Sequence, residues 1–164
     1  MQCILSALRS ESQPFIHYFH LERETSFNFP VYRNNDLYLL GIGIGKKLIK
    51  KRVSTFFKNM NKPSVQFINI GLAGGKKGIH EIGDIFLINK IKDEASQKLL
   101  YPDILIKHPF QESGITTVDK SIGDGGAKYQ DLVDMEASEI FKICSQLSSI
   151  NNIAFIKIVS DHMD

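Results

Sequence analysis

Cysteine is scarce in this sequence: Cys3 and Cys144 are the only two, and both lie in apolar stretches. Two lone thiols do not make a disulfide framework and suit a reducing compartment, so we expect a cytoplasmic protein. No apolar run approaches the roughly 18 residues of a membrane-spanning helix, so no membrane association is expected. The first residues carry no basic segment ahead of an apolar one, and we therefore expect no secretory signal.

A strong excess of either charge is also missing. The 20 Lys and Arg residues nearly balance the 18 Asp and Glu residues, which leaves a net charge of +2. This charge is too mild to indicate a nucleic-acid partner by itself. The densest basic segment, residues 46–52, has no aromatic residues between its charges, so it is typical of the solvated face of a helix. A nucleic-acid-binding patch is the less favoured alternative, and we expect no nucleic-acid partner.

The remaining composition is that of an ordinary globular protein, with 43% hydrophobic and 23% charged residues in 164. This length suits one domain, residues 1–164, with a sizeable core. Apolar segments of strand length occur at residues 3–8, 27–32, 37–42, 65–70, 82–88, 115–118 and 153–159. Amphipathic helical patterns follow Gly45 and Glu136. Strands that alternate with helices predict an α/β class: a three-layer sandwich with a central mixed β-sheet flanked by helices.

Two glycine clusters follow predicted strands. Residues 41–45 read Gly-Ile-Gly-Ile-Gly, but the G-x-G-x-x-G spacing of a dinucleotide site is absent, so we expect no cofactor. Residues 71–75 read Gly-Leu-Ala-Gly-Gly and follow the strand predicted at 65–70. Glycines at such a place let the backbone approach a ligand closely. A tight turn with no ligand is the alternative interpretation.

Three carboxylates, Glu11, Glu136 and Asp161, each lie where a predicted strand ends. Ligands of open α/β sheets bind outside the carboxyl ends of the strands, so these side chains are candidates for one polar cleft. For Glu11 the alternative is a first-turn glutamate that stabilises the dipole of the next helix, which Ser10 or Ser12 is expected to cap. Glu136 stands at a strand-to-helix junction, where backbone N–H groups favour an anion or a sugar hydroxyl.

The sequence gives little support for a metal site or for a serine nucleophile. His17 and His20, with Glu22 beyond them, form the only close histidine pair, and no further ligand has suitable spacing. These histidines are typical of a half-exposed helix, and we expect no metal site. The G-x-S-x-G signature of the commonest serine hydrolases does not occur.

Several stretches together resemble the nucleoside phosphorylase / nucleosidase superfamily, and most closely its methylthioadenosine and adenosylhomocysteine nucleosidase branch. They occur in the family's order and span the chain. These stretches are residues 6–11 (Ser-Ala-Leu-Arg-Ser-Glu), 43–46 (Gly-Ile-Gly-Lys), 69–75 (Asn-Ile-Gly-Leu-Ala-Gly-Gly), 82–84 (Ile-Gly-Asp), 117–119 (Thr-Val-Asp), 133–137 (Val-Asp-Met-Glu-Ala) and 159–161 (Val-Ser-Asp).

The resemblance implies a purine nucleoside as substrate and a role for each matching residue. Glu11 corresponds to the glutamate that orients or activates the attacking water, and Asp161 to the aspartate that helps protonate N7 of the departing purine. The implied substrate-binding residues are Met135 against the ribose, Glu136 on the ribose hydroxyls, Ser160 in support of Asp161, and Ala73 and Gly74 along the ribose and base. To hold a proton for the base, Asp161 is expected to be buried in a cleft.

Water or phosphate as the nucleophile is left open by the sequence. Leu72 and Ala73 occupy the place where phosphorylase relatives have an arginine and hydroxyl residues, which favours water; Arg9 and Arg33 keep phosphate possible. Relatives of this type usually continue into a final helix after the Ser-Asp motif. We expect that helix to be absent here, and a catalytically impaired nucleoside-binding protein is a further alternative. A homodimer is expected by resemblance.

Overall fold

The computed structural model describes residues 1–60 and 64–164. Its strands, in chain order, are β1 (Gln2–Ser6), β2 (Glu22–Arg23), β3 (Val31–Asn34), β4 (Leu37–Gly41), β5 (Gln66–Gly74), β6 (Ile85–Asp93), β7 (Leu99–Leu100), β8 (Gln111–Thr117), β9 (Leu132–Asp134) and β10 (Ile153–Asp161). The helices are α1 (Arg9–Tyr18), α2 (Lys46–Asn59) and α3 (Ala137–Cys144), and a short 3₁₀ turn covers Ile150–Asn152.

All of these strands belong to one mixed sheet with the order β10-β6-β8-β9-β5-β1-β4-β3-β2, and β7 pairs with β6. β10 also pairs with β5, so that β5, β9, β8, β6 and β10 close into a ring. β1 runs parallel to both of its neighbours, β4 and β5, whereas β10 is parallel to β5 and antiparallel to β6. The mixed sheet predicted from the sequence is thereby confirmed.

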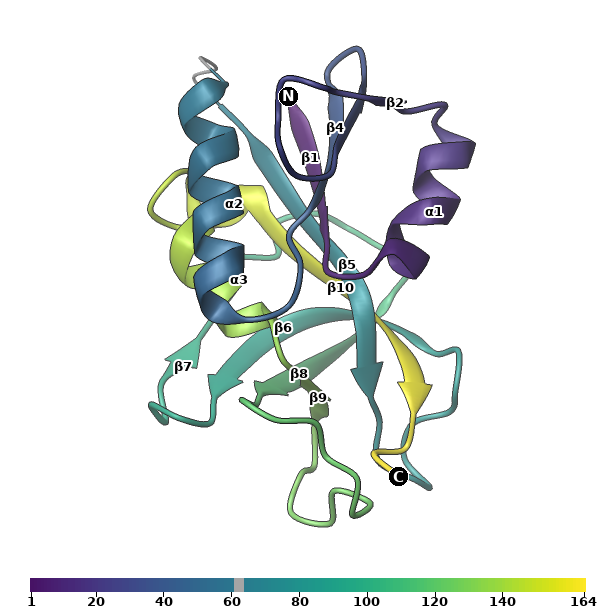
Figure 1. Cartoon of the computed structure of the whole chain (residues 1–164). Helices are drawn as coiled ribbons and strands as arrows, with labels where there is room; N and C mark the ends of the chain where they lie inside the picture. The colour runs from purple at the N-terminus through teal and green to yellow at the C-terminus, as the bar shows by residue number, and fades with distance from the viewer. Residues whose placement is uncertain (61–63) are drawn as a thin grey trace.

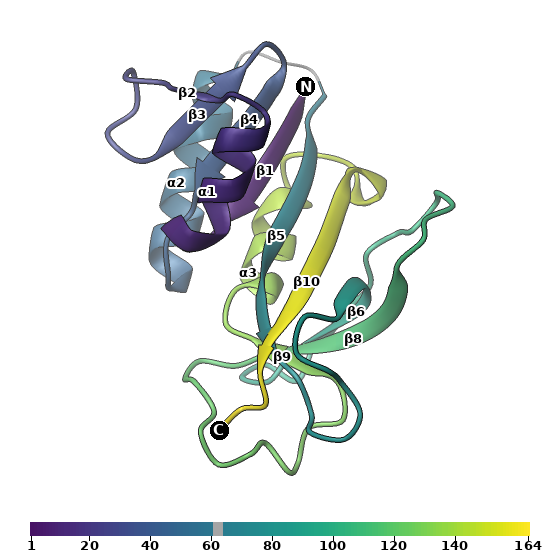
Figure 2. The same cartoon turned by 90° about the vertical axis from the view of Figure 1, so that its right-hand side faces the viewer.

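Helices cover the two faces of this sheet unequally. α2 and α3 lie together on one side of it, and α1 lies on the other (Figure 1). α2 turns Ile49, Val53 and Phe56 into the core at spacings of four and three residues, as an amphipathic helix must. Figure 2 shows α1 beside β1, and none of the described residues forms a helix in front of β5 and β10. The three-layer sandwich is therefore confirmed, and its α1 layer spans only part of the sheet.

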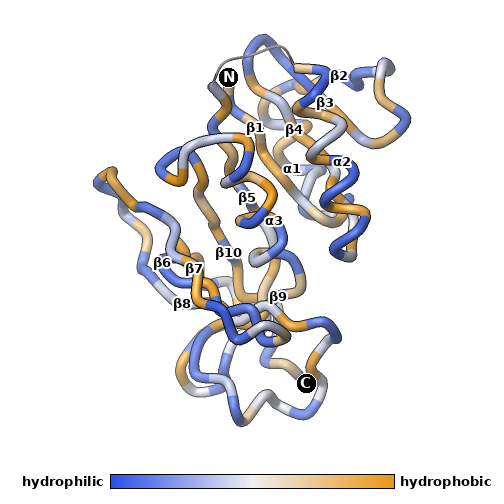
Figure 3. Tube along the Cα trace, turned by 90° about the vertical axis from the view of Figure 1, so that its left-hand side faces the viewer, coloured by the Kyte–Doolittle hydropathy of each residue, from blue (hydrophilic) through white to orange (hydrophobic). Residues whose placement is uncertain are grey.

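The core lies between α2, α3 and the sheet, and it contains both thiols. Cys3 and Cys144 are fully buried and free, and burial raises the pKa of each thiol. Figure 3 shows the apolar residues running along the strands, while the loops around the C-terminal end are largely hydrophilic. Within the described residues, no helix is both long enough and apolar enough to cross a membrane.

Two local predictions differ from the structure. The segment 71–74, predicted as a glycine-rich turn, is the last part of β5, because β10 pairs with it through Ile158↔Leu72 and Val159↔Ala73. α1 begins without a side-chain cap from Ser10 or Ser12. Instead Glu11 accepts a hydrogen bond of 2.8 Å from the backbone N–H of Leu8, the residue that precedes the helix. Strand pairing with β10 thus overrides the turn preference of the glycines in 71–74, and the Glu11 carboxylate caps α1 in place of a serine.

Candidate active site

A cavity of about 530 Å³ lies at the carboxyl ends of β5, β9 and β10. It contains six of the seven residues that the sequence analysis assigned to a site. Its lining consists of Leu8, Leu72, Ala73, Gly74, Val118, Ser121, Ile122, Gly123, Val133, Asp134, Met135, Glu136, Ser160, Asp161, Met163 and Asp164. Chain segments more than 80 residues apart in sequence, at Ala73 and Ser160, meet here because β5 and β10 are paired in parallel.

Glu11, the seventh predicted residue, lies beside this cavity and does not line it. Its Oε2 atom accepts hydrogen bonds of 2.8 Å from the N–H groups of Ala7 and Leu8, and its Oε1 atom accepts one of 3.1 Å from the N–H of Leu72. Both carboxylate oxygens thus tie the start of α1 to the end of β5. This geometry supports the capping interpretation, and the activation of water by Glu11 stays a prediction.

A buried ion pair that the sequence analysis missed lies under the cavity. Lys157 Nζ is 2.8 Å from Asp134 Oδ2, and the two side chains are only 1% and 0% exposed. Asp134 also accepts hydrogen bonds from the hydroxyl of Thr117, at 2.8 Å, and from the N–H of Ala137, at 2.9 Å. The sequence did contain a signal for this pair. Side chains alternate along a strand, so Lys157 lies on the same side of β10 as the buried Phe155 and Val159, where a charge is tolerated only if it is paired.

Glu136 is half-buried between these charges. Its pKa is raised, chiefly because burial penalises the charged carboxylate and also because Asp134 is close; Lys157 and the N–H of Met135 oppose the rise. The negative charge of Glu11 contributes in the same direction as Asp134. The carboxylates of Glu11, Asp134 and Glu136 therefore lie close together. Among the described residues, Lys157 is the single buried cation near them.

The raised pKa of Glu136 predicts how stability changes with pH. Because the folded chain binds this proton more tightly than the unfolded chain, the associated stability is full below the usual pKa of 4.5 and is lost as pH rises through the raised value. Glu136→Gln keeps a neutral side chain, so its free energy of unfolding should rise relative to wild type over that range. Urea unfolding of both proteins from about pH 4 to pH 8 measures this difference. A difference that does not change with pH would contradict the expected titration.

Asp161 reaches the cavity from the end of β10, but its side chain is exposed. The burial expected from the sequence is wrong for this chain, because Asp161 is the last residue of β10 and is exposed there. Two donors orient it: the Ser160 hydroxyl lies 2.6 Å from Oδ2, and the N–H of Met163 donates to Oδ1 at 2.8 Å. The pairing of Ser160 with Asp161 thus agrees with the expected supporting role of Ser160.

A second hollow of about 480 Å³ adjoins the cavity and shares Val118 and Met135 with it. Its other lining residues come from residues 44–48, at the start of α2, and from Asp119. Lys46 Nζ and Asp119 Oδ1 form an ion pair of 2.6 Å across this hollow. Met135 therefore lines both spaces, the one that contains Glu136 and the one at the start of α2.

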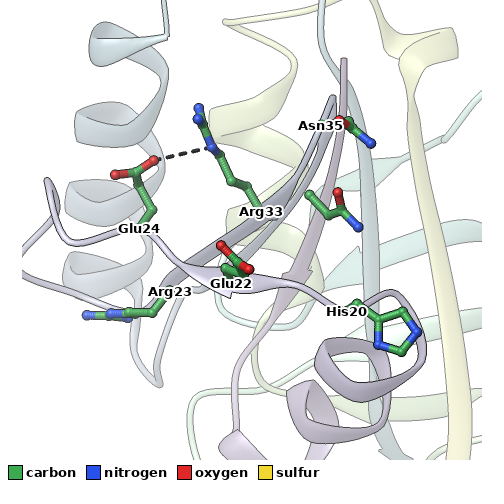
Figure 4. A pocket seen from close by; sticks show the side chains of 7 residues that line it. His20, Glu22, Arg23, Glu24, Arg33 and Asn35 are labelled. Carbon is green, nitrogen blue, oxygen red and sulfur yellow. Dashed lines mark ion pairs between the residues drawn. The ribbon is translucent and has the colours of Figure 1, made fainter.

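A third hollow, about 500 Å³ in volume, lies far along the sheet at β2 and β3 and contains no predicted site residue (Figure 4). Arg33, which the sequence left open as a phosphate ligand, is in this hollow, and its Nε is 3.4 Å from Glu24 Oε2. Neither Arg33 nor Arg9 lines the cavity at β5, β9 and β10. Among the described residues that line that cavity, none is an arginine or a lysine.

No protein-family model matches the sequence, and the curated proteins contain no match to it. Solved structures do resemble it. CT263 (MTAN) from Chlamydia trachomatis aligns over 99% of this chain and 82% of its own, with a TM-score of 0.77 and 21% identity. The 5′-methylthioadenosine/S-adenosyl homocysteine nucleosidase of Campylobacter jejuni aligns over 99% and 86%, with a TM-score of 0.78 and 19% identity.

The 5′-methylthioadenosine/S-adenosylhomocysteine nucleosidase from S. pneumoniae, solved with the transition-state inhibitor MT-ImmA, aligns over the same 99% and 86%. Its TM-score is 0.77 and its identity 16%. Likeness over nearly the whole chain establishes that this protein has the mixed α/β fold of these nucleosidases. At such low identity the fold is what the comparison establishes.

Proposed function

We propose that this chain is a purine nucleosidase that cleaves an N-glycosidic bond with water as the nucleophile. The observation that carries the proposal is the cavity at β5, β9 and β10, which holds Glu136 and Asp161 together although they come from different strands. The similar solved structures include a 5′-methylthioadenosine/S-adenosyl homocysteine nucleosidase, which supports the same class of substrate.

The charges of the cavity suit this reaction. Cleavage of the bond builds positive charge on the ribose and negative charge on the leaving base. Glu136, near the buried end of the cavity, would bind the ribose hydroxyls and stabilise the sugar cation. Asp161, at the exposed end, would give a proton to the base, which itself would cover the carboxylate once bound. Met135 lines both hollows, so a 5′ substituent would extend past it toward the start of α2.

Water is favoured over phosphate because none of the described residues that line the cavity is a cation that could hold a phosphate. The lining contains neither arginine nor lysine among the described residues, and the nearby Lys157 is paired with Asp134. Since a phosphate dianion requires charged or convergent N–H donors, a neutral nucleophile fits this cavity better.

The test is an assay for free base with pure protein and 5′-methylthioadenosine, S-adenosylhomocysteine and adenosine, each with and without phosphate. We expect free adenine and free sugar at a rate that phosphate does not change. Base release only in the presence of phosphate, with a sugar phosphate as product, would overturn the choice of water.

The exposure of Asp161 supports a second candidate, a nucleoside-binding protein with impaired catalysis. Calorimetric binding of a purine nucleoside without base release would favour this candidate over the enzyme.

In the enzyme, a second copy of the chain could cover Asp161, and we propose a homodimer on this ground. The two free buried thiols support a cytoplasmic location.

A further inference from the structure

Met163 has a backbone conformation that its side chain does not favour. Its φ is 60°, in the left-handed region that few residues other than glycine adopt. The side chain is nevertheless only 2% exposed, and it lines the candidate cavity next to Asp161. A strained residue of this kind persists when its surroundings fix it, and such residues concentrate at ligand-binding sites. The contacts of Met163 identify what fixes it.

The backbone of Met163 joins two parts of the cavity. Its N–H donates to Asp161 Oδ1 at 2.8 Å, and its carbonyl oxygen accepts from the N–H of Gly125 at 2.8 Å. The preceding residue is held as well, since His162 Nε2 lies 3.0 Å from the carbonyl oxygen of His80. The chain after β10 is therefore bound at two successive residues, His162 and Met163, and it connects Asp161 to the loop between β8 and β9.

The side chain of Met163 fills the space between the end of β5 and that loop. A Cβ atom at Gly74 would lie 2.6 Å from Met163 Cγ, and a Cβ at Gly126 would collide with Met163 Sδ. The other contacts are apolar: Met163 belongs to a buried cluster with Val118, Tyr129 and Val133. Two glycines thus leave room for one flexible thioether, which adapts its shape to an irregular gap.

We infer that Met163 is a positioning residue for Asp161: its wedged side chain holds the backbone N–H that orients the Asp161 carboxylate toward the leaving base. The inference rests on the proposed function and adds a residue to it. Without the side chain, the left-handed turn has no packing to maintain it, and the N–H moves away from Oδ1. Proton transfer to the base then suffers, because misplacement by about 1 Å can cost about 100-fold in rate.

The test compares two leaving groups in Met163→Ala and Met163→Leu. A purine needs a proton to depart, whereas p-nitrophenolate departs from a riboside without one. We expect Met163→Ala to lower kcat for adenine release from 5′-methylthioadenosine by about 10- to 100-fold, with little change for p-nitrophenyl riboside. Met163→Leu, which preserves the volume, should restore most of the adenine release. Met60→Ala, at the end of α2, is the matched control and should change neither rate.

The outcomes separate the inference from the proposed function. Equal losses on both ribosides, or no loss on either, would overturn the positioning role while leaving the nucleosidase in place. A wild-type protein that releases base from no purine nucleoside would overturn the function, and the inference with it. Circular-dichroism melts of each variant show whether a lost rate reflects unfolding.

Discussion

Asp161→Asn is expected to lower kcat for adenine release from 5′-methylthioadenosine by about 10²- to 10⁴-fold, the usual contribution of a general acid. An amide cannot deliver the carboxyl proton to the base, yet it is isosteric with the carboxylate. It still accepts a hydrogen bond from the Ser160 hydroxyl or from the N–H of Met163, so the end of β10 keeps its shape. Because the side chain is exposed, the free energy of unfolding should hardly change.

The same two leaving groups make this prediction specific. Adenine release should fall steeply in Asp161→Asn, while p-nitrophenyl riboside should be cleaved at nearly the wild-type rate. Asp103→Asn, an exposed aspartate outside the cavity, serves as the matched control and should leave both rates unchanged. Near-normal adenine release by Asp161→Asn would remove Asp161 from the mechanism.

Lys157→Met is expected to lower the free energy of unfolding by about 3–5 kcal/mol, because it leaves the buried Asp134 without its counter-ion. Both side chains are almost fully buried at a separation of 2.8 Å, so water cannot replace the lost cation. Methionine keeps the length of the lysine side chain, which limits the loss from packing. Urea denaturation at neutral pH measures the change, and the midpoint should shift without a change in slope.

Two further variants test the electrostatic origin of that loss. Lys157→Met combined with Asp134→Asn removes both charges and should recover much of the stability, since a neutral pair leaves no buried ion. Lys90→Met breaks the more exposed pair of Lys90 with Asp131, whose side chains are 41% and 33% exposed, and should cost about 1 kcal/mol or less. Similar losses in Lys157→Met and Lys90→Met would show that burial is not what makes the first pair important.

The sequence predicts the fold well where local pattern and tertiary pairing agree. α2 appears where the spacing of Ile49, Val53 and Phe56 places it, and β10 covers the apolar run that begins at Ile153. The prediction of a turn at residues 71–74 is wrong because local pattern and tertiary pairing disagree there. The glycines favour a turn locally, but β10 supplies a register partner for every residue of the segment, and only long-range pairing could reveal that.

The sequence predicts which residues meet at one cavity, but it predicts their burial only in part. Motif resemblance placed Glu136, Asp161 and Met135 in one cavity, and the structure brings them there. Burial was not predictable in the same way: Asp161 is exposed, because exposure depends on what packs over the end of a strand. Lys157 was overlooked although strand alternation marks it as buried.

Met163 was missed for a different reason. Its role depends on a left-handed backbone and on two glycines, Gly74 and Gly126, that lie far from it in sequence. Spacing rules describe regular helices and strands, and a single residue in an irregular conformation leaves no periodic signal.

In the proposed reaction, Glu136 and Asp161 act on the two sides of one glycosidic bond. A crystal structure of Asp161→Asn with 5′-methylthioadenosine tests this arrangement, because the slowed reaction leaves the substrate intact. We predict the ribose hydroxyls within hydrogen-bonding distance of Glu136, the purine N7 facing the side chain at position 161, and the 5′ group passing Met135 toward α2. A nucleoside bound elsewhere, for example in the hollow at Arg33 and Glu24, or one that contacts neither position 136 nor position 161, would show that these two residues do not act on the bond.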